Sequence, residues 1–371
     1  MKEINNVSSI ALGRGDVVVG VDTHKDQHIA VALDGLGGRI GELTIDANPR
    51  GYAELLGWAD QLGAHSAFGV EGTGSYGSGL ARFLRRHARK VIEVSRPPRK
   101  GQRRLSGKSD AIDAEHAARE VLAGTATATP KLADGIVESI RLTKIARDSA
   151  VKAHSQAIIT LKATLVTATD DLRAELEPLT DFKLVDACAA LDTTGDIANP
   201  DVAMRRVLAS LASRWLELHE EIKTHTRALN ALTRSAAPDL VDAFGIGPDT
   251  AAEMLVAAGD NTNRIRSEAA LAKLCGACPI PAGSGKTNGR HRLNRGGNRQ
   301  ANAALYRVII VRMRWHPPTI DYVERRTAEG LSKKEIMGFP PFRGDPVIDG
   351  EASHWPALWC HRIGPGAPGA I

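Results

Sequence analysis

The first 125 residues carry an ordered series of strand and helix patterns that few folds can accommodate. Three strand patterns follow one another closely, at residues 16–22, 27–34 and 38–46, and Asp34-Gly35 supplies turn chemistry between the second and the third. Connections this short favour antiparallel pairing of neighbouring strands. We therefore expect the sheet to begin with a meander of three strands.

Helix and strand patterns alternate after this meander. They predict, in order, a helix, a strand, a helix, a strand and a helix, over residues 49–62, 66–71, 78–87, 90–94 and about 109–122. This order is that of the ribonuclease H-like α/β fold, whereas a dinucleotide-binding domain would begin with a strand-helix-strand unit. The sequence therefore predicts a ribonuclease H-like domain over residues 16–125.

A glycine-rich stretch, VEGTGSYG at residues 70–77, follows the fourth strand pattern. It contains G-x-G-x-x-G, and Glu93 lies about 20 residues further on, as in a dinucleotide site. Glu71, however, stands directly before the first glycine and would place a negative charge beside a pyrophosphate. A nicotinamide site is therefore disfavoured, and we expect the glycines to leave room for a nucleic-acid backbone.

Four carboxylates are expected to meet at one edge of this domain. Asp22 ends the first strand and Glu71 ends the fourth, and these strands are neighbours in a ribonuclease H-like sheet. Asp110 and Asp113 are three residues apart, which places both on one face of a helix. Two such charges 4 Å apart repel by roughly 4 kcal/mol at an effective dielectric constant of 20. Divalent ions relieve this repulsion, so the four acids are candidate ligands of Mg²⁺, or of Mn²⁺ as a substitute.

Other polar residues close to these acids receive no role in the predicted site. His24 and Lys25 could approach a phosphate, but the simpler interpretation is a surface turn. Asp26 and Glu115 are expected to face solvent. The predicted site therefore consists of carboxylates alone.

A basic segment separates the fifth strand pattern from the helix of Asp110. Residues 96–108 contain no acid, and a mobile loop of this composition attracts phosphates, although a merely solvated loop is the alternative. The predicted phosphate-binding residues are Arg96, Arg99, Lys100, Arg103, Arg104 and Lys108.

Residues 132–236 change to helical periodicity. Apolar residues repeat every seven positions and indicate a helical hairpin or coiled coil, which either pairs subunits or closes a bundle within one chain. One seam comprises Leu208, Trp215, Ile222 and Leu229, with Leu211, Leu218, His225 and Leu232 at the companion positions. The weaker partner seam comprises Val151, Ile158, Leu165 and Leu172.

A third region, residues 237–336, is expected to be mainly helical. Gly245-Ile246-Gly247 followed by Pro248 is typical of a helix-hairpin-helix, a turn whose backbone N–H groups can bind phosphate, although a plain pair of helices also explains it. Ser284 lies between two glycines in a basic segment, where it is a candidate nucleophile or part of a simple linker. The surrounding cations are Lys286, Arg290, Arg292, Arg295 and Arg299.

Composition limits the partners and the compartment. The net charge of +5 and the isoelectric point near 9.0 favour acidic partners, nucleic acid first. Four cysteines are too few for a disulfide framework in 371 residues, which fits a reducing cytoplasm. The sequence shows no signal peptide and no apolar run long enough to span a membrane. Residues 337–371 are rich in proline and glycine without any period, which indicates an atypical, disordered or frameshifted tail.

Five motifs in this order resemble the IS-one-ten family of insertion-sequence transposases, which are DEDD recombinases related to the Piv DNA invertases. They are GVDTHKD, VEGTGSYG, KSDAIDA, GIGPDTAAEML and SGKTNGRHRLNRGGNRQANAALYR. The resemblance implies a RuvC-like domain in which Asp22, Glu71, Asp110 and Asp113 bind Mg²⁺. It implies that Ser284 attacks a DNA phosphate to form a covalent 5′-phosphoserine link. It further implies a bridge RNA that pairs with donor and target DNA, assembly into dimers and tetramers, and a place in the bacterial cytoplasm at the nucleoid.

Two other functions remain open at this stage. A metal-dependent nuclease or junction resolvase would use the carboxylates with water and would have no use for Ser284. A decayed, non-catalytic nucleic-acid-binding remnant is the second, because the family continues past the K-K-E motif with another basic helix and this chain does not.

Overall fold

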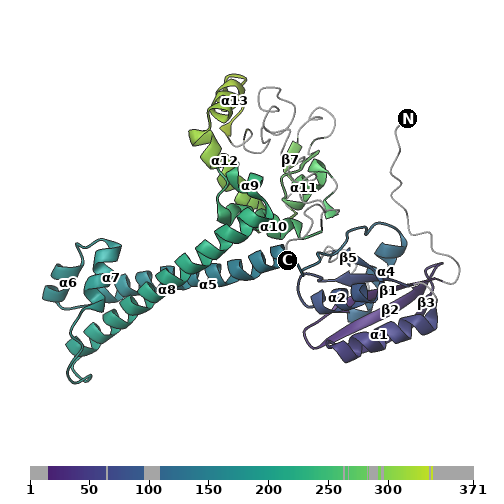
Figure 1. Cartoon of the computed structure of the whole chain (residues 1–371), viewed down its shortest axis with the longest axis horizontal. Helices are drawn as coiled ribbons and strands as arrows, with labels where there is room; N and C mark the ends of the chain where they lie inside the picture. Colours follow the sequence, from purple (N-terminus) through teal and green to yellow (C-terminus); the bar gives the residue numbers. More distant parts are fainter. Residues whose placement is uncertain are drawn as a thin grey trace, which may run out of the picture. The chain divides into compact units, whose positions relative to one another are not determined.

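The computed structural model describes residues 16–63, 66–95, 109–261, 264–265, 267–281, 283, 291–293, 296–333 and 336. The chain divides into two compact units, residues 1–132 and residues 133–371. The first unit contains a sheet with helices, drawn in purple and blue in Figure 1, and the second is mostly helical.

The sheet of the first unit has five strands among the described residues. They are β1 (Val17–Thr23), β2 (Gln27–Asp34), β3 (Arg39–Asp46), β4 (Ser66–Glu71) and β5 (Lys90–Val94). Their order is β3-β2-β1-β4-β5; β1, β2 and β3 are antiparallel, and β1, β4 and β5 are parallel. The predicted meander is therefore confirmed, and the mixed sheet is compatible with a ribonuclease H-like fold.

Three helices among the described residues cover the two faces of this sheet. They are α1 (Pro49–Leu62), α2 (Ser78–Arg86) and α4 (Asp110–Leu122). Strand residues such as Val19 and Phe68 form one core with α1 and α2, whereas Val18 and Val31 form a second core with α4. Both faces of the central strands are thus buried, which is why β1 and β4 are apolar up to their last residues.

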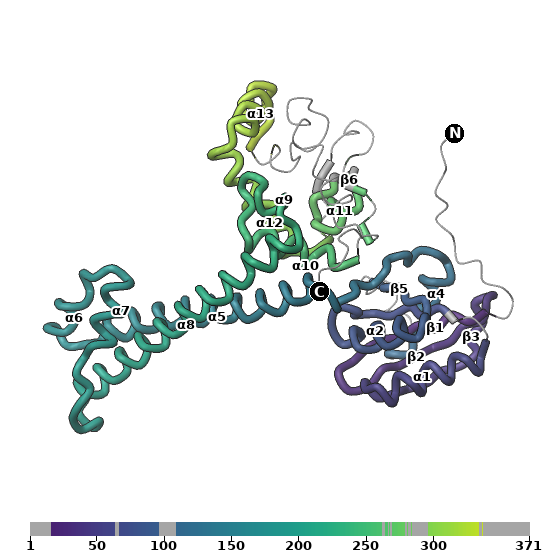
Figure 2. The backbone as a smooth tube through the Cα atoms, in the orientation of Figure 1, coloured from purple at the N-terminus to yellow at the C-terminus, as the bar shows by residue number. Residues whose placement is uncertain are grey.

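A long helical hairpin dominates the second unit, and the backbone trace of Figure 2 shows its two helices side by side. The hairpin consists of α5 (Ile136–Leu165) and α8 (Pro200–Ala236), with α6 (Asp170–Leu176) and α7 (Asp181–Ala189) between them in the chain. Leu161 packs with Leu208 in one core and Ile140 with Leu229 in another, so the two helices are antiparallel.

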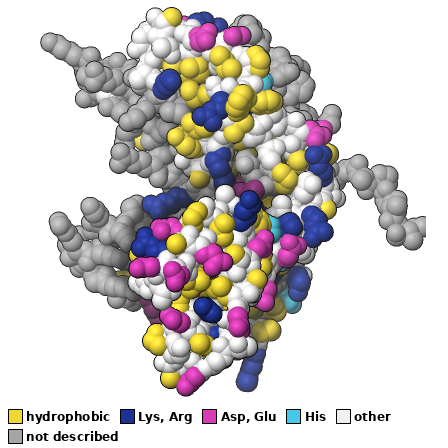
Figure 3. Space-filling model, turned by 90° about the vertical axis from the view of Figure 1, so that its left-hand side faces the viewer, with side chains coloured by type: hydrophobic (Ala, Val, Ile, Leu, Met, Phe, Trp, Pro, Cys, Tyr) yellow, Lys and Arg dark blue, Asp and Glu magenta, His cyan; other side chains and the backbone are white. Residues whose placement is uncertain are grey.

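The predicted apolar seam of α8 is divided between these two cores. Trp215 is buried, but Ile222 is only half-buried. Close to Ile222, Arg147 Nε donates a hydrogen bond of 2.9 Å to Thr226 Oγ1, so polar groups interrupt the seam. On the face that Figure 3 shows, hydrophobic side chains are scattered among acidic and basic ones. Pairing of subunits through this hairpin stays a prediction.

The base of the hairpin packs against a cluster of shorter elements. They are α9 (Pro238–Asp242), α10 (Pro248–Ala258), α11 (Glu268–Leu274), β6 (Pro279–Pro281), β7 (His291–Leu293), α12 (Arg299–Trp315) and α13 (Pro317–Ala328). Helix α10 is buried on nearly all sides, because its side chains fill the core between α5, α8 and α12. No helix in the described ranges is long and apolar enough to cross a membrane.

The turn before α10 uses its glycines in different ways. Gly245 has a φ of +81°, a conformation that favours glycine, and Gly247 caps the N-terminus of α10. The preceding helix α9 has only five residues. A phosphate-binding helix-hairpin-helix at this turn stays a prediction.

Candidate metal and nucleic-acid site

The register of the sheet places Asp22 and Glu71 next to each other. Val21 pairs with Val70 in the parallel ladder of β1 and β4, and both side chains lie in the core beneath α1 and α2. Since side chains alternate along a strand, the next residues, Asp22 and Glu71, lie on the opposite face, which α4 covers. Both are buried, with 8% and 4% of their surface exposed. Thr23 Oγ1 ties the two strand ends together by donating a hydrogen bond of 3.0 Å to the carbonyl oxygen of Glu71.

Two glycines bring α4 close to this pair of acids. A Cβ atom at Gly20 would lie 2.0 Å from Ala114 O, and one at Gly69 would lie 2.8 Å from Ala117 O. The backbone of α4 therefore rests directly on the sheet, two residues before each acidic strand end. This close packing carries Asp110, in the first turn of α4, to the ends of β1 and β4. This role of the two glycines was not predicted, and the repeated G-V-D and G-V-E are its signal in the sequence.

The surroundings of Asp22 disfavour its charged form. Burial raises the pKa of Asp22, and the charges of Asp110 and Asp113 raise this pKa further, while His24 opposes the shift. Three of the four predicted carboxylates therefore lie close enough to repel one another. The Asp110 side chain is 42% exposed, so the cluster is open to solvent on this side.

His24 lies in the exposed turn between β1 and β2, as predicted, and its ring also contacts this cluster. Its Nε2 atom lies 3.1 Å from Asp22 Oδ2 and 3.4 Å from Asp110 Oδ2. The signal in the sequence is the D-x-H spacing, because residues two apart at a strand end point to the same side. The sequence alone did not show that a histidine in this turn would reach the acids.

The donor atoms of this cluster fit a divalent metal ion. One ligand atom each from Asp22, His24 and Asp110 lie within 4.8 Å of one another. Carboxylate oxygens are the ligands that Mg²⁺ and Mn²⁺ prefer, and imidazole nitrogen is compatible with the latter. An ion here would also remove the repulsion that raises the pKa of Asp22.

The glycine-rich stretch after β4 forms a tight turn around Glu71. Gly72 has a φ of +62°, and a Cβ atom at Gly77 would lie 2.6 Å from Glu71 O, whereas Gly74 has open space around it. Gly72 and Gly77 are thus required by the conformation and close packing of the turn itself. The antiparallel start of the sheet also excludes a dinucleotide-binding domain, as the sequence predicted.

Most of the predicted phosphate-binding residues lie outside the described residues. This holds for Arg96, Arg99, Lys100, Arg103, Arg104, Lys108, Lys286, Arg290 and Arg295, and for the candidate nucleophile Ser284. Arg292 lies in β7, but its side chain is outside the description too. Arg299 is the first residue of α12 and is exposed.

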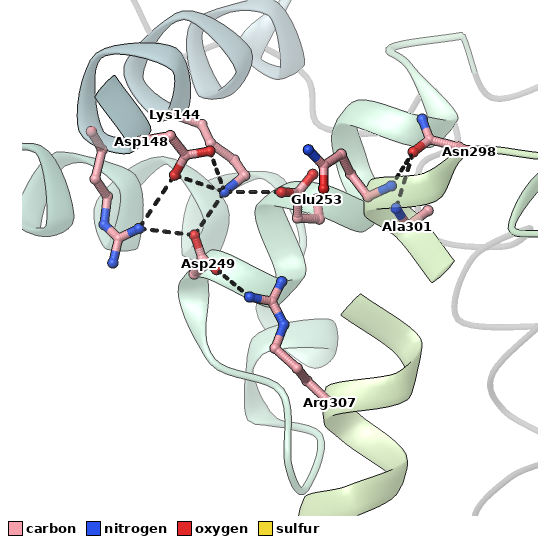
Figure 4. A network of polar contacts seen from close by, with 9 residues as sticks. Lys144, Asp148, Asp249, Glu253, Asn298, Ala301 and Arg307 are labelled. Carbon is pink, nitrogen blue, oxygen red and sulfur yellow. Dashed lines mark hydrogen bonds and ion pairs between the residues drawn. The ribbon is translucent and has the colours of Figure 1, made fainter. Parts of the chain in front are cut away.

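A second cluster of charges, in the helical unit, was not anticipated from the sequence. Lys144 Nζ lies 2.8 Å from Asp249 Oδ1 and 3.0 Å from Glu253 Oε1, and it also pairs with Asp148 (Figure 4). Arg147 and Arg307 contact Asp249 at 3.0 Å and 3.4 Å. We call these six residues the Lys144 network. It links α5, α10 and α12, and no local pattern indicates it because its partners are up to 109 positions apart, as Lys144 and Glu253 are.

The Lys144 network favours the charged forms of its members. Burial alone would raise the pKa of Asp249, but the hydrogen bond and charge of Lys144, with Arg147 and Arg307, lower it overall. Burial alone would lower the pKa of Lys144, but its bonds to the three carboxylates raise it overall. The network is therefore a structural tie between helices.

Comparison with known proteins assigns both units to transposases. A model of DEDD-type transposases matches residues 19–169, and a model described as the transposase IS116/IS110/IS902 family matches residues 239–324. The DEDD type implies a divalent metal, in agreement with the donor atoms around Asp22. The class defined by the fold and the site is thus that of the DEDD transposases.

A curated relative agrees with this class. The chain is 33% identical over 133 residues to the Insertion element IS110 uncharacterized 43.6 kDa protein of Streptomyces coelicolor. The match covers 35% of this chain and 33% of the relative, so the chain spans about a third of that protein. Together with the two family models, this match shows that the chain belongs to the IS110 family of insertion-sequence transposases.

Proposed function

We propose that the chain is a DNA transposase that cuts and rejoins strands with divalent ions, Mg²⁺ in the cell, held by Asp22, Glu71, Asp110 and Asp113. The observation that carries this proposal is the burial of Asp22 beside Asp110 and Asp113, which raises its pKa. Carboxylates with a perturbed pKa occur often at functional sites, and a bound cation relieves their repulsion. Bound ions would neutralise the charge that develops on a reacting DNA phosphate.

The proposed chemistry is two successive exchanges at phosphorus. The Ser284 hydroxyl oxygen attacks a DNA phosphate, a serine–phosphate bond forms, and the bond to the 3′ oxygen breaks, so that the serine proton leaves with the 3′ hydroxyl. The 3′ hydroxyl of another strand then attacks the phosphoserine and releases Ser284. One phosphate ester replaces another in each step, so no high-energy cofactor is needed.

The basic segments at residues 96–108 and 286–299 would hold the DNA by its phosphates, with Arg299 at the exposed start of α12. A bridge RNA would select the donor and target sequences, and the α5–α8 hairpin would pair subunits into dimers or tetramers. Exposed hydrophobic residues on the hairpin support the pairing: Ile159 is 60% exposed and Val166 57% exposed.

A suicide DNA substrate that traps a covalent intermediate tests the serine step. We expect the native chain to form a protein–DNA adduct, and Ser284→Ala to form none while it still binds DNA. Ser235→Ala, at an exposed position of α8, is the matched control and should form the adduct. Metal-dependent cleavage by Ser284→Ala without an adduct would instead identify a nuclease that uses water. Inactivity of the native chain with every divalent ion would point to a decayed transposase.

A further inference from the structure

His24 brings a nitrogen donor into a cluster of oxygens. The His24 side chain is 45% exposed, and its Nε2 atom contacts carboxylate oxygens from two different elements, the end of β1 and the first turn of α4. Asp22 and Asp110 are far apart in the sequence, so the contact with both depends on the packing of α4 on the sheet. His24 is not one of the four acidic positions after which the DEDD type is named.

The two distances from His24 Nε2 are those of neighbouring ligands around one ion. Bonds of about 2.1 Å in an octahedral shell place adjacent ligand atoms about 3 Å apart. Nε2 lies 3.1 Å from the Asp22 oxygen and 3.4 Å from the Asp110 oxygen. In the metal-free protein, the contact between Nε2 and Asp22 is a hydrogen bond. A divalent ion that binds all three side chains would keep the same three ligand atoms together.

We propose that His24 is an inner-sphere nitrogen ligand, with Asp22 and Asp110, of one of the divalent ions of the transposase site. This inference rests on the proposed function. A nitrogen ligand shifts the preference of a site toward Mn²⁺ relative to Mg²⁺, because Mg²⁺ binds oxygen donors almost exclusively, whereas imidazole suits later metals. His24 therefore sets which ion the site prefers.

Spectroscopy of bound Mn²⁺ tests the ligand directly, without DNA and without turnover. Mn²⁺ is titrated into the full chain, and pulsed electron paramagnetic resonance measures the coupling of bound Mn²⁺ to ¹⁴N. We expect a directly coordinated nitrogen in the native chain and its loss in His24→Phe. We also expect the Mn²⁺ affinity of this variant to fall about tenfold or more, with a smaller fall for Mg²⁺.

His87→Phe is the matched control, since His87 is an exposed histidine of the same unit whose ring contacts Phe83 with ring centroids 4.2 Å apart. It should keep both the nitrogen coupling and the affinity. Phenylalanine replaces a ring that is open to solvent in each variant, so both should fold, which circular dichroism verifies.

Asp22→Asn distinguishes a failure of the His24 proposal from a failure of the proposed metal site. If Asp22→Asn loses Mn²⁺ but His24→Phe binds it with native affinity, or if bound Mn²⁺ shows no nitrogen coupling, the assignment of His24 is overturned and the carboxylate site stands. If Asp22→Asn binds Mn²⁺ as the native chain does, the metal site itself is wrong and both proposals fall.

Discussion

The two units of the chain each bury a cluster of carboxylates, and they treat these charges in opposite ways. Burial and neighbouring carboxylates raise the pKa of Asp22 in the first unit. In the second unit the cations around Asp249 lower its pKa. The Lys144 network balances three cations with three carboxylates among the described residues. The Asp22 cluster gathers carboxylates around a single histidine.

This difference separates a binding site from a structural tie. A balanced network holds helices together and offers little to a ligand, because its charges already satisfy one another. A cluster of like charges destabilises the isolated protein. A cation that binds there relieves the repulsion, and this relief contributes to its binding free energy. Four changes test the comparison, from the largest expected effect to the smallest.

Asp22→Asn should nearly abolish the reaction without weakening the fold. We expect excision of a marked element in cells to fall by about 10²–10³-fold, because the amide cannot neutralise a bound ion. The melting temperature of the metal-free protein should stay the same or rise, since a buried charge and its repulsion are removed. Native excision by this variant would contradict the metal role of the Asp22 cluster.

Gly20→Ala should separate α4 from the sheet. The new Cβ atom would lie 2.0 Å from Ala114 O and 2.3 Å from Ala118 N, which are backbone atoms that cannot turn away. We expect a loss of about 3 kcal/mol in the free energy of unfolding, measured by urea denaturation, together with weaker Mn²⁺ binding. Gly57→Ala is the control, since its Cβ meets open space in α1, and it should stabilise the chain by about 0.5–1 kcal/mol.

Lys144→Met should weaken the second unit, because it leaves Asp249 and Glu253 without their shared buried cation. We expect a loss of about 2–3 kcal/mol in the free energy of unfolding, reduced from the value for a fully buried pair because Asp249 is 30% exposed. Lys152→Met, at an exposed position of the same helix, should change stability by less than about 0.5 kcal/mol. Equal effects of the two changes would show that the network does not tie the helices.

The pH dependence of stability should have opposite signs in the two clusters. The folded-state pKa of Asp22 lies above 3.8, so its ionisation opposes folding, and this penalty grows as pH rises above 3.8 through the folded pKa. The folded-state pKa of Asp249 lies below 3.8, so its contribution is present above pH 3.8 and is lost as pH falls through the folded pKa.

Denaturation at pH 3.5 and pH 7 with EDTA measures both trends. The stability gained by Asp22→Asn should be larger at pH 7 than at pH 3.5, and the stability lost by Asp249→Asn should also be larger at pH 7. Each pKa unit corresponds to about 1.4 kcal/mol. If the stability difference between each variant and the native chain is the same at both pH values, neither carboxylate has a shifted pKa.

Local patterns were sufficient to predict the elements of the first unit. Helix α1 begins and ends at the predicted residues because Asn48 caps its N-terminus, accepting a hydrogen bond from the Gly51 N–H, and Gly63 follows its end. Helix α2 ends one residue earlier than predicted, at Arg86, and Ala88 beyond it adopts a positive φ of 57°. These features depend on neighbours in the sequence, which pattern and capping rules describe.

The sequence by itself determined the strands, the helices and the acids that end β1 and β4, since alternation and turn chemistry act over a few residues. Only the tertiary structure decided that His24 meets both Asp22 and Asp110, and that Lys144 meets Asp249 across 105 positions. The physical reason is range. Contacts between distant residues depend on how closely whole helices pack. Helix α4 packs closely on the sheet because Gly20 and Gly69 have no side chains there, and no pattern of side chains in the sequence indicates this packing.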